Sequence, residues 1–300
     1  MERPQHVPVL LEESLDFLKV RELAGKGATI VDATLGLGGH SSAIARALGA
    51  EGRLFCFDRD EQAMALARQR MDDVAAELGS AMPAVQYVPQ AFSTAAEVLR
   101  PGSVDALLAD FGVSSLQLDE AHRGFSFRAD GPLDMRMDAR SGLTAEQVVN
   151  QADEEELANL IYEFGEERRS RRIARAIVRA RPISTTAELA RVVSAVAPPI
   201  KGQIHPATLT FQAIRIRVND ELGEIQSLLR SAGSLLKPGG RVVLISFHSL
   251  EDRLVKDAFR ESARRDEFAV LTKKPVTATE EEARANPRSR SAKLRAAEKL

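Results

Sequence analysis

The stretch DATLGLGGHSS (Asp32 to Ser42) joins an apolar run to a helical pattern. A strand that ends in an acid and continues into glycines and a helix brings bare backbone close to a ligand at the carboxyl end of the strand. Gly36, Gly38 and Gly39 leave room that a Cβ would fill. A phosphate, a dinucleotide and an adenosyl cofactor all suit such a turn, so the surrounding residues must decide between them.

The acidic residues around this turn favour S-adenosylmethionine. Ser41 occupies the third glycine position of the dinucleotide fingerprint, so that fingerprint is incomplete. Asp32 would repel a pyrophosphate but suits the ammonium group of an amino-acid tail. Asp58 ends the next predicted strand and can accept from both ribose hydroxyls, which NAD and S-adenosylmethionine share. Asp110, ending the strand in LLADFG, completes a series typical of methyltransferases; an NAD-dependent dehydrogenase stays the alternative.

The rest of the chain predicts an α/β fold with an insertion. Helical patterns alternate with the predicted strands ATIVDA, GRLFCFD, AVQYVP and VDALLADFG, which is typical of a parallel sheet covered on both faces. The region 118–206 shows only helical patterns and loops, and LLKPGGRVVLIS then returns to a helix, a turn and a strand. We predict one discontinuous sheet domain, residues 1–117 and 207–300, and an inserted helical domain, residues 118–206.

Composition narrows the class of protein. The chain has 300 residues, 44% hydrophobic and 28% charged, as in ordinary globular domains. It has no apolar run near the ~18 residues of a membrane span and no signal-peptide pattern, so we expect a cytoplasmic protein. The histidines show no metal-site spacing, and we expect no metal. With a net charge of −2, a nucleic-acid partner would need local basic patches.

Six stretches together resemble one family. They are HVPVLLEESL, VDATLGLGGHS, DFGVSSLQLDEAHRGFSFRADGPLDMRMD, HPATLTFQAIRIRVNDEL, ISFHSLEDRLVKDAF and NPRSRSAKLR. In the same order they are similar to motifs of the MraW family of bacterial 16S rRNA (cytosine-N4)-methyltransferases. The resemblance implies a class I, Rossmann-like methyltransferase sheet with an inserted all-helical substrate-recognition domain.

The resemblance also implies the activity and its partners. The reaction is transfer of a methyl group from S-adenosyl-L-methionine to the N4 amine of a decoding-centre (P-site) cytidine in 16S rRNA. The partner is the assembled or nearly assembled small ribosomal subunit, with no DNA and no membrane. The implied cofactor contacts, in addition to Asp32 and Gly36 from the turn itself, are Gly38, Gly39, His40, Asp58, Phe92, Asp110 and Gln117.

Two of these contacts have a physical interpretation in the sequence. His40 begins the helix after the glycine turn, where its backbone N–H can face a carboxylate. Phe92, after the third predicted strand, can flank an adenine, with an ordinary core phenylalanine as the alternative.

The residue types available limit the chemistry. Methylation of cytosine at C5 requires a cysteine nucleophile, and the single cysteine, Cys56, lies inside an apolar strand. The chemistry therefore points to an exocyclic amine or an oxygen, reached by direct in-line transfer. The Asp/Asn/Ser-Pro-Pro-Tyr/Phe motif of many amino-methyltransferases is replaced by DFGV, which keeps the acid but has neither the prolines nor the final aromatic residue. We hypothesise that Asp110 or a nearby backbone carbonyl accepts from the amine, and that Ser246, Phe247 and His248 complete the pocket, with Phe247 stacking on the base. A hydrogen-bonded loop is the alternative for SFHS.

Two arginine-rich segments are candidate contacts for rRNA phosphates. They contain Arg168, Arg172, Arg175 and Arg179 on one predicted helical face, and Arg288, Arg290, Lys293 and Arg295 in the tail. A solvated face balanced by glutamates is the alternative for the first segment. A non-catalytic RNA-binding assembly factor is the alternative for the whole chain.

Overall fold

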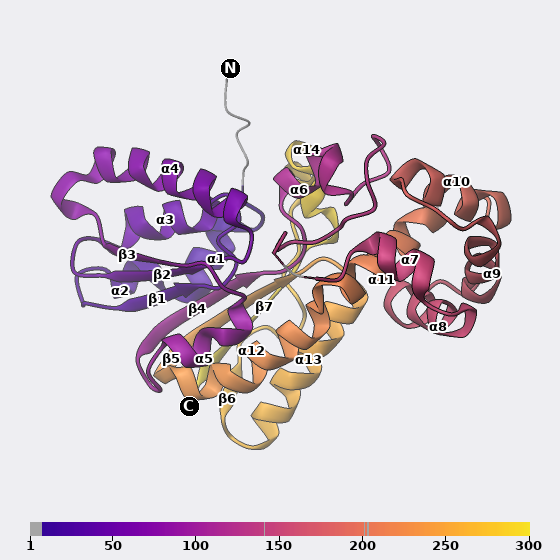
Figure 1. The fold of residues 1–300 in the computed structure, drawn as a ribbon. Helices are drawn as coiled ribbons and strands as arrows, with labels where there is room; N and C mark the ends of the chain where they lie inside the picture. Colours follow the sequence, from indigo (N-terminus) through magenta and orange to yellow (C-terminus); the bar gives the residue numbers. More distant parts are fainter. Residues whose placement is uncertain (1–7, 141, 201, 203) are drawn as a thin grey trace. The chain divides into compact units, whose positions relative to one another are not determined.

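The computed structural model describes residues 8–140, 142–200, 202 and 204–300 and divides the chain into two compact units. The sheet unit is the chain up to Gly112 together with Leu222–Leu300, and the helical unit is Val113–Glu221 (Figure 1). The helical segment thus begins slightly before residue 118 and ends well after residue 206, at which the sequence pattern placed its end.

Seven strands of the described chain form one sheet in the order β3-β2-β1-β4-β5-β7-β6. Their bounds are β1 Thr29–Asp32, β2 Arg53–Phe57, β3 Ala84–Val88, β4 Val104–Asp110, β5 Leu236–Ser246, β6 Phe268–Val270 and β7 Lys293–Lys299. The first five strands are parallel and confirm the strands predicted from sequence. β7 runs antiparallel to both β5 and β6, and neither β6 nor β7 was predicted.

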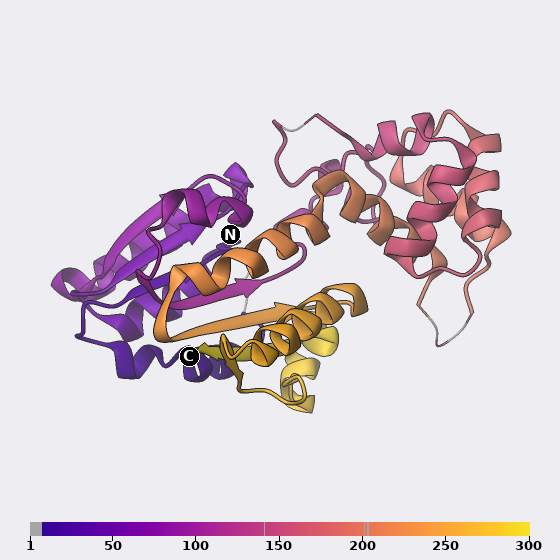
Figure 2. The ribbon, with the colours of Figure 1, turned by 90° about the horizontal axis from the view of Figure 1, so that it is seen from below.

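Alternate residues of the central strands face two separate hydrophobic cores. Ile30 and Leu108 join α1, α3 and α4 in one core, whereas Val31 and Leu107 join α12 and α13 in the other. Successive side chains of a strand point to opposite faces, so a sheet covered on both faces needs nearly continuous apolar strands. Figures 1 and 2 show these helices flanking the sheet. The helices of this unit are α1 Leu11–Leu18, α2 Val20–Leu23, α3 Gly39–Leu48, α4 Glu61–Leu78, α5 Ala95–Val98, α12 Glu221–Leu235, α13 Ser249–Arg264 and α14 Glu280–Ala285.

The Pro-Gly-Gly segment was expected as a turn before the last predicted strand, but it lies inside that strand, β5. β5 begins at Leu236, which pairs with Val104, and the next pair joins Arg241 to Ala106. The four residues KPGG therefore bulge out of the ladder opposite a single residue of β4.

The helical unit is built around its own core. Its helices are α6 Ser115–Asp119, α7 Ala145–Gln151, α8 Glu154–Gly165, α9 Ser170–Ala180, α10 Thr186–Val196 and α11 Pro206–Asn219. α11 belongs here because Phe211 and Ile214 share a core with Ile161 of α8. α8 and α9 are separate helices, because Glu166 ends α8 in the left-handed conformation with φ 52°. Among the described residues, no helix has the length and apolar composition that crossing a bilayer requires.

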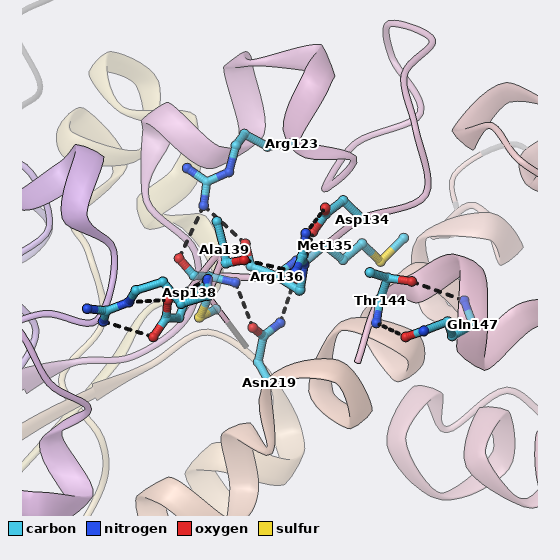
Figure 3. A network of polar contacts seen from close by, with 11 residues as sticks. Arg123, Asp134, Met135, Arg136, Asp138, Ala139, Thr144, Gln147 and Asn219 are labelled. Carbon is cyan, nitrogen blue, oxygen red and sulfur yellow. Dashed lines mark hydrogen bonds and ion pairs between the residues drawn. The ribbon is translucent and has the colours of Figure 1, made fainter. Parts of the chain in front are cut away.

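Side-chain hydrogen bonds (Figure 3), together with an isolated bridge from Pro132 to Thr185, hold the segment that carries GPLDMRMD. Asn219 of α11 accepts from the amide of Met137 at 2.8 Å and donates to the carbonyl of Met135 at 2.7 Å. Arg123 donates to the carbonyls of Arg136 and Met137 at 3.1 and 3.3 Å. One asparagine and one arginine thus hold three consecutive residues of an irregular segment against the helical unit.

Candidate cofactor and active site

The glycine turn lies between β1 and α3, where close neighbours leave little room for side chains. Gly38 has φ +75°, and a Cβ there would lie 3.2 Å from the Cβ of Ala67 in α4. A Cβ on Gly39 would lie 2.5 Å from Cγ of Pro8. The second contact shows that the segment beginning at Pro8 packs directly on the turn, which its sequence did not reveal.

Asp32, at the end of β1, holds the glycine turn through hydrogen bonds to its carboxylate. Its carboxylate accepts from the hydroxyl of Ser41 at 2.6 Å and from the amide of Thr34 at 3.1 Å. The side chain is buried, and that burial raises its pKa. Ser41, which breaks the dinucleotide fingerprint, is therefore the partner of this acid. Asp32 therefore orients the turn through its hydrogen bonds to Ser41 and Thr34.

Asp58 links the glycine turn to the end of β2. One carboxylate oxygen accepts from the amide of Gly36 and the other from the amide of Asp60, both at 2.8 Å. Burial raises the pKa of Asp58 to about 6. Each oxygen keeps a second lone pair, so an ionised Asp58 can still accept from ligand hydroxyls.

Asp110 ends β4 beside His40, the second residue of α3. Its amide donates to the hydroxyl of Thr34 at 2.6 Å, and its Oδ2 lies 3.8 Å from Nδ1 of His40. Oδ1 is buried and has no hydrogen-bond partner among the residues described. Burial raises the pKa of Asp110 well above its usual value, and the charges of Asp32 and Glu251 raise it further.

His40 gives that carboxylate no positive charge. Burial lowers the pKa of His40 to about 4, so its ring is neutral at pH 7. Nε2 lies 3.1 Å from the carbonyl of Val9, which can only accept, so Nε2 carries the hydrogen and Nδ1 presents a lone pair to Asp110. Among the described residues no cation faces Oδ1, so an ionised Asp110 would be stabilised by a cation or a hydrogen-bond donor brought by a ligand.

The residues at the end of β5 and just after it also belong to the candidate site of the sheet unit. The ring of Phe247 lies 3.5 Å from the point where a Cβ on Gly112 would be. Ser246 is buried in the sheet, and its hydroxyl donates to the carbonyl of Lys293 at 3.3 Å. Nδ1 of His248 accepts from the amide of Glu251 at the start of α13. Ser246 and His248 thus have separate partners and do not form a nucleophilic dyad.

Two other predicted cofactor contacts are Phe92, in the sheet unit, and Gln117, in the helical unit. Phe92 follows β3 in a short turn, half-buried, with its ring centre 5.8 Å from that of Phe111. Gln117 belongs to the helical unit, where it is buried and forms a reciprocal cap with Ser114. Thr34 and Glu251 were not predicted as site residues. Glu251 follows His248 by three residues, the spacing of a helix capping pair, which is a signal that the sequence contains.

The two basic segments differ in structure. Arg172, Arg175 and Arg179 are exposed on α9, with Arg175 3.2 Å from Glu154, whereas Arg168 lies in the turn before the helix. In the tail, Lys293 is half-buried and begins strand β7. The remaining tail residues differ in exposure: Arg290 is exposed, Arg288 half-buried and Arg295 buried.

Arg295 is an internal ion-pair residue, which corrects its assignment as an RNA contact. Its Nε lies 2.6 Å from Oδ1 of Asp252 in α13, and Lys293 lies 3.4 Å from the other oxygen.

Replacing Arg295 with alanine should lower the free energy of unfolding by about 3 kcal/mol, because it leaves Asp252 with a single weaker partner. Urea unfolding checks this against Arg290→Ala, which should change it by less than about 0.5 kcal/mol. Equal stability of the two variants would contradict the assignment.

A Rossmann-like sheet with acids ending β1, β2 and β4 around a glycine turn, and an antiparallel β7 between β5 and β6, defines a class I S-adenosyl-L-methionine-dependent methyltransferase. The sequence profile of the MraW methylase family matches residues 3–300, and the chain belongs to this family. The cofactor is S-adenosyl-L-methionine. A dehydrogenase is thereby excluded.

Relatives of this chain match it over nearly its whole length. Three are named "Ribosomal RNA small subunit methyltransferase H". One from Acidobacterium capsulatum is 67% identical over 300 residues and covers 100% of each chain. One from Koribacter versatilis is 56% identical, covering 99% of this chain and 95% of its own length. One from Solibacter usitatus is 49% identical, covering 98% and 99%.

Proposed function

We propose that this protein methylates the N4 amine of a decoding-centre (P-site) cytidine in 16S rRNA within the assembled or nearly assembled small ribosomal subunit, and that it acts in the cytoplasm. The observation that carries the proposal is Asp110, a half-buried acid whose buried Oδ1 has no hydrogen-bond partner in the described chain and whose neighbouring imidazole is neutral. Such a group suits an N–H donor or a cation. The names of the relatives support small-subunit rRNA as the substrate.

The surroundings of the cysteine support an amine rather than C5 as the methylated atom. Cys56 is the only cysteine of the chain and is buried in β2, 3.3 Å from the hydroxyl of Ser41. Burial, together with the charge of Asp32, raises the pKa of its thiol far above the usual value. A thiolate nucleophile is therefore not available here, and C5 methylation requires one.

Residues of the sheet unit fit S-adenosyl-L-methionine. Backbone at Gly36, Gly38 and Gly39 would approach the amino-acid end, Asp58 would accept from the ribose hydroxyls, and Phe92 would flank the adenine. When bound, the cofactor supplies an electrophilic methyl group on a sulfonium. Asp110 lies where it can accept an N–H of the cytosine amine, which strengthens the nitrogen's nucleophilic character as the new bond forms. Gln117 is a further proposed contact.

The exposed arginines of the helical unit are proposed to contact rRNA phosphates. Substituting Arg172 and Arg179 with alanine should weaken RNA binding and flatten its salt dependence. Each lost phosphate contact should reduce the slope of log affinity against log salt by roughly 0.7–0.9. Binding measured from about 50 to 200 mM salt, with exposed Arg264→Ala of the sheet unit as control, checks this. Equal affinity at all salt concentrations would contradict phosphate contact.

Comparing possible acceptors tests the substrate class. Methyl-labelled S-adenosylmethionine is offered with small subunits from cells lacking the modification, with free 16S rRNA and with cytosine-containing DNA. We expect label in the subunits, less in the free RNA and none in the DNA. Label in DNA alone, or in no ribosomal substrate while the cofactor still binds, would contradict the proposed substrate.

A further inference from the structure

The turn that carries Phe247 lies beyond the last backbone bond between β4 and β5. That bond joins the amide of Phe111 to the carbonyl of Ile245 at 2.9 Å. Beyond this bond, the described structure has no strand pairing that fixes the backbone of Phe247 and His248. The half-buried Phe247 ring packs against the hydrophobic core that contains Ile30 and Leu108, and the backbone that carries it opposite Gly112 needs a further partner.

Glu251 of α13 makes the contacts that hold this turn. Its side chain is fully buried, and Oε2 accepts from the amides of Phe247 and His248 at 2.7 and 3.3 Å. Nδ1 of His248 accepts from the amide of Glu251, so Nε2 carries the hydrogen and faces Oε1 at 3.2 Å. The carboxylate therefore engages both backbone amides of the turn through Oε2, while Oε1 lies beside the imidazole without a hydrogen bond to it.

The space opposite Phe247 is left open by a glycine. Gly112 has φ +100°, a conformation that residues with a Cβ rarely adopt, and a Cβ there would lie 3.5 Å from the Phe247 ring. The ring therefore lies over the backbone of Gly112, two residues after Asp110, the last residue of β4. A flat face in that position suits a planar base.

We infer that Glu251 is a positioning residue that holds the Phe247 ring where the target base stacks on it. Glu251 acts through the hydrogen bond that its carboxyl oxygen accepts from the Phe247 amide, and not through its charge. This rests on the proposed function. The charge has a separate effect, since it is one of the causes of the raised pKa of Asp110.

Two substitutions separate reach from charge. Glu251→Gln keeps the length of the side chain and one acceptor oxygen for the Phe247 amide but loses the charge. Glu251→Asp keeps the charge but is one methylene too short. If reach matters, the aspartate variant should lose about 30-fold in kcat, within the range that base stacking contributes, and the glutamine variant should stay within about threefold. Exposed Glu261→Gln on the same helix is the matched control.

A double-mutant cycle tests whether Glu251 acts through Phe247. Phe247→Leu should also lower kcat about 30-fold, and adding Glu251→Asp should lower it little further, because the group it positions is already gone. The Kd for S-adenosylmethionine should change by less than about threefold in every variant. Thermal melting confirms that each variant is folded at the assay temperature.

The outcomes that overturn the inference are distinct from failure of the proposed function. If the unmodified protein makes N4-methylcytidine but Glu251→Asp retains its kcat, or Glu251→Gln loses it, the inference is wrong. Effects of Glu251→Asp and Phe247→Leu that simply multiply would also overturn it. If the unmodified protein makes no N4-methylcytidine, the proposed function fails first.

Discussion

Replacing Asp110 with asparagine should lower kcat for methyl transfer by at least about 100-fold, the usual cost of removing a group that stabilises charge in a transition state. Asparagine has nearly the same shape, but its weaker acceptor and its amide hydrogens do not suit an amine whose N–H must be held. Steady-state methylation of small subunits gives the rate. Asp72→Asn, exposed on α4, is the control and should leave the rate unchanged.

The same substitution should stabilise the cofactor-free protein. Asp110 has its pKa raised by burial and by neighbouring acids, so the folded state holds a proton that the unfolded state releases more readily. Its contribution to the free energy of unfolding is therefore greatest below the unfolded pKa and is lost as the pH rises through the folded pKa. The asparagine side chain does not ionise and carries no such penalty, so the gain should grow with pH.

Melting curves at pH 5 and pH 8 check this trade-off between stability and activity. We expect Asp110→Asn to raise Tm by roughly 3 °C at pH 8, the shift that about 1 kcal/mol produces in a unit of this size, and by less at pH 5. A variant that keeps its rate, or that melts lower than the unmodified protein at pH 8, would contradict the role assigned to Asp110.

The second large effect is expected at Asp58. Replacing it with alanine should weaken binding of S-adenosylmethionine by about 30-fold or more, because the variant loses an acceptor for the ribose and also the hydrogen bond that holds the amide of Gly36. Binding to the unmodified protein should also weaken as the pH falls through about 6, where the Asp58 carboxylate takes up a proton.

Isothermal titration with S-adenosylmethionine at pH 5, 6 and 7.5 measures both effects. The dependence on pH should be smaller in Asp58→Ala, with Asp72→Asn as the matched control that keeps the full dependence. Equal Kd values for the unmodified protein at pH 5 and 7.5 would contradict an ionised Asp58 as the ribose acceptor.

The strands that carry the site could be predicted because burial on both faces requires apolar runs, and an acid that ends such a run marks the ligand edge. Strand β7 could not be predicted in the same way. Its LRAAEK pattern places Arg295 inside the sheet, and only Asp252, far away in the sequence, makes that burial favourable. The break between α8 and α9 at Glu166 depends on a single left-handed residue, which propensity does not specify.

The partners of the predicted acids also lie beyond sequence reasoning. The acids were predicted from their place at strand ends, but the neutral state of His40 depends on its burial beside the carbonyl of Val9, thirty-one residues away. The fixing of the glycine turn likewise depends on Ser41 and on Pro8, which local pattern does not connect to it. These contacts decide the charge and geometry of the site.

The central claim is that the cytosine amine, held by Asp110, receives the methyl group. Small subunits lacking the modification are incubated with the purified protein and methyl-labelled S-adenosylmethionine, and their RNA is digested to nucleosides and separated. The account predicts label in N4-methylcytidine from the decoding region, with at least about 100-fold slower formation by Asp110→Asn. Label in 5-methylcytidine or on a ribose oxygen would contradict it.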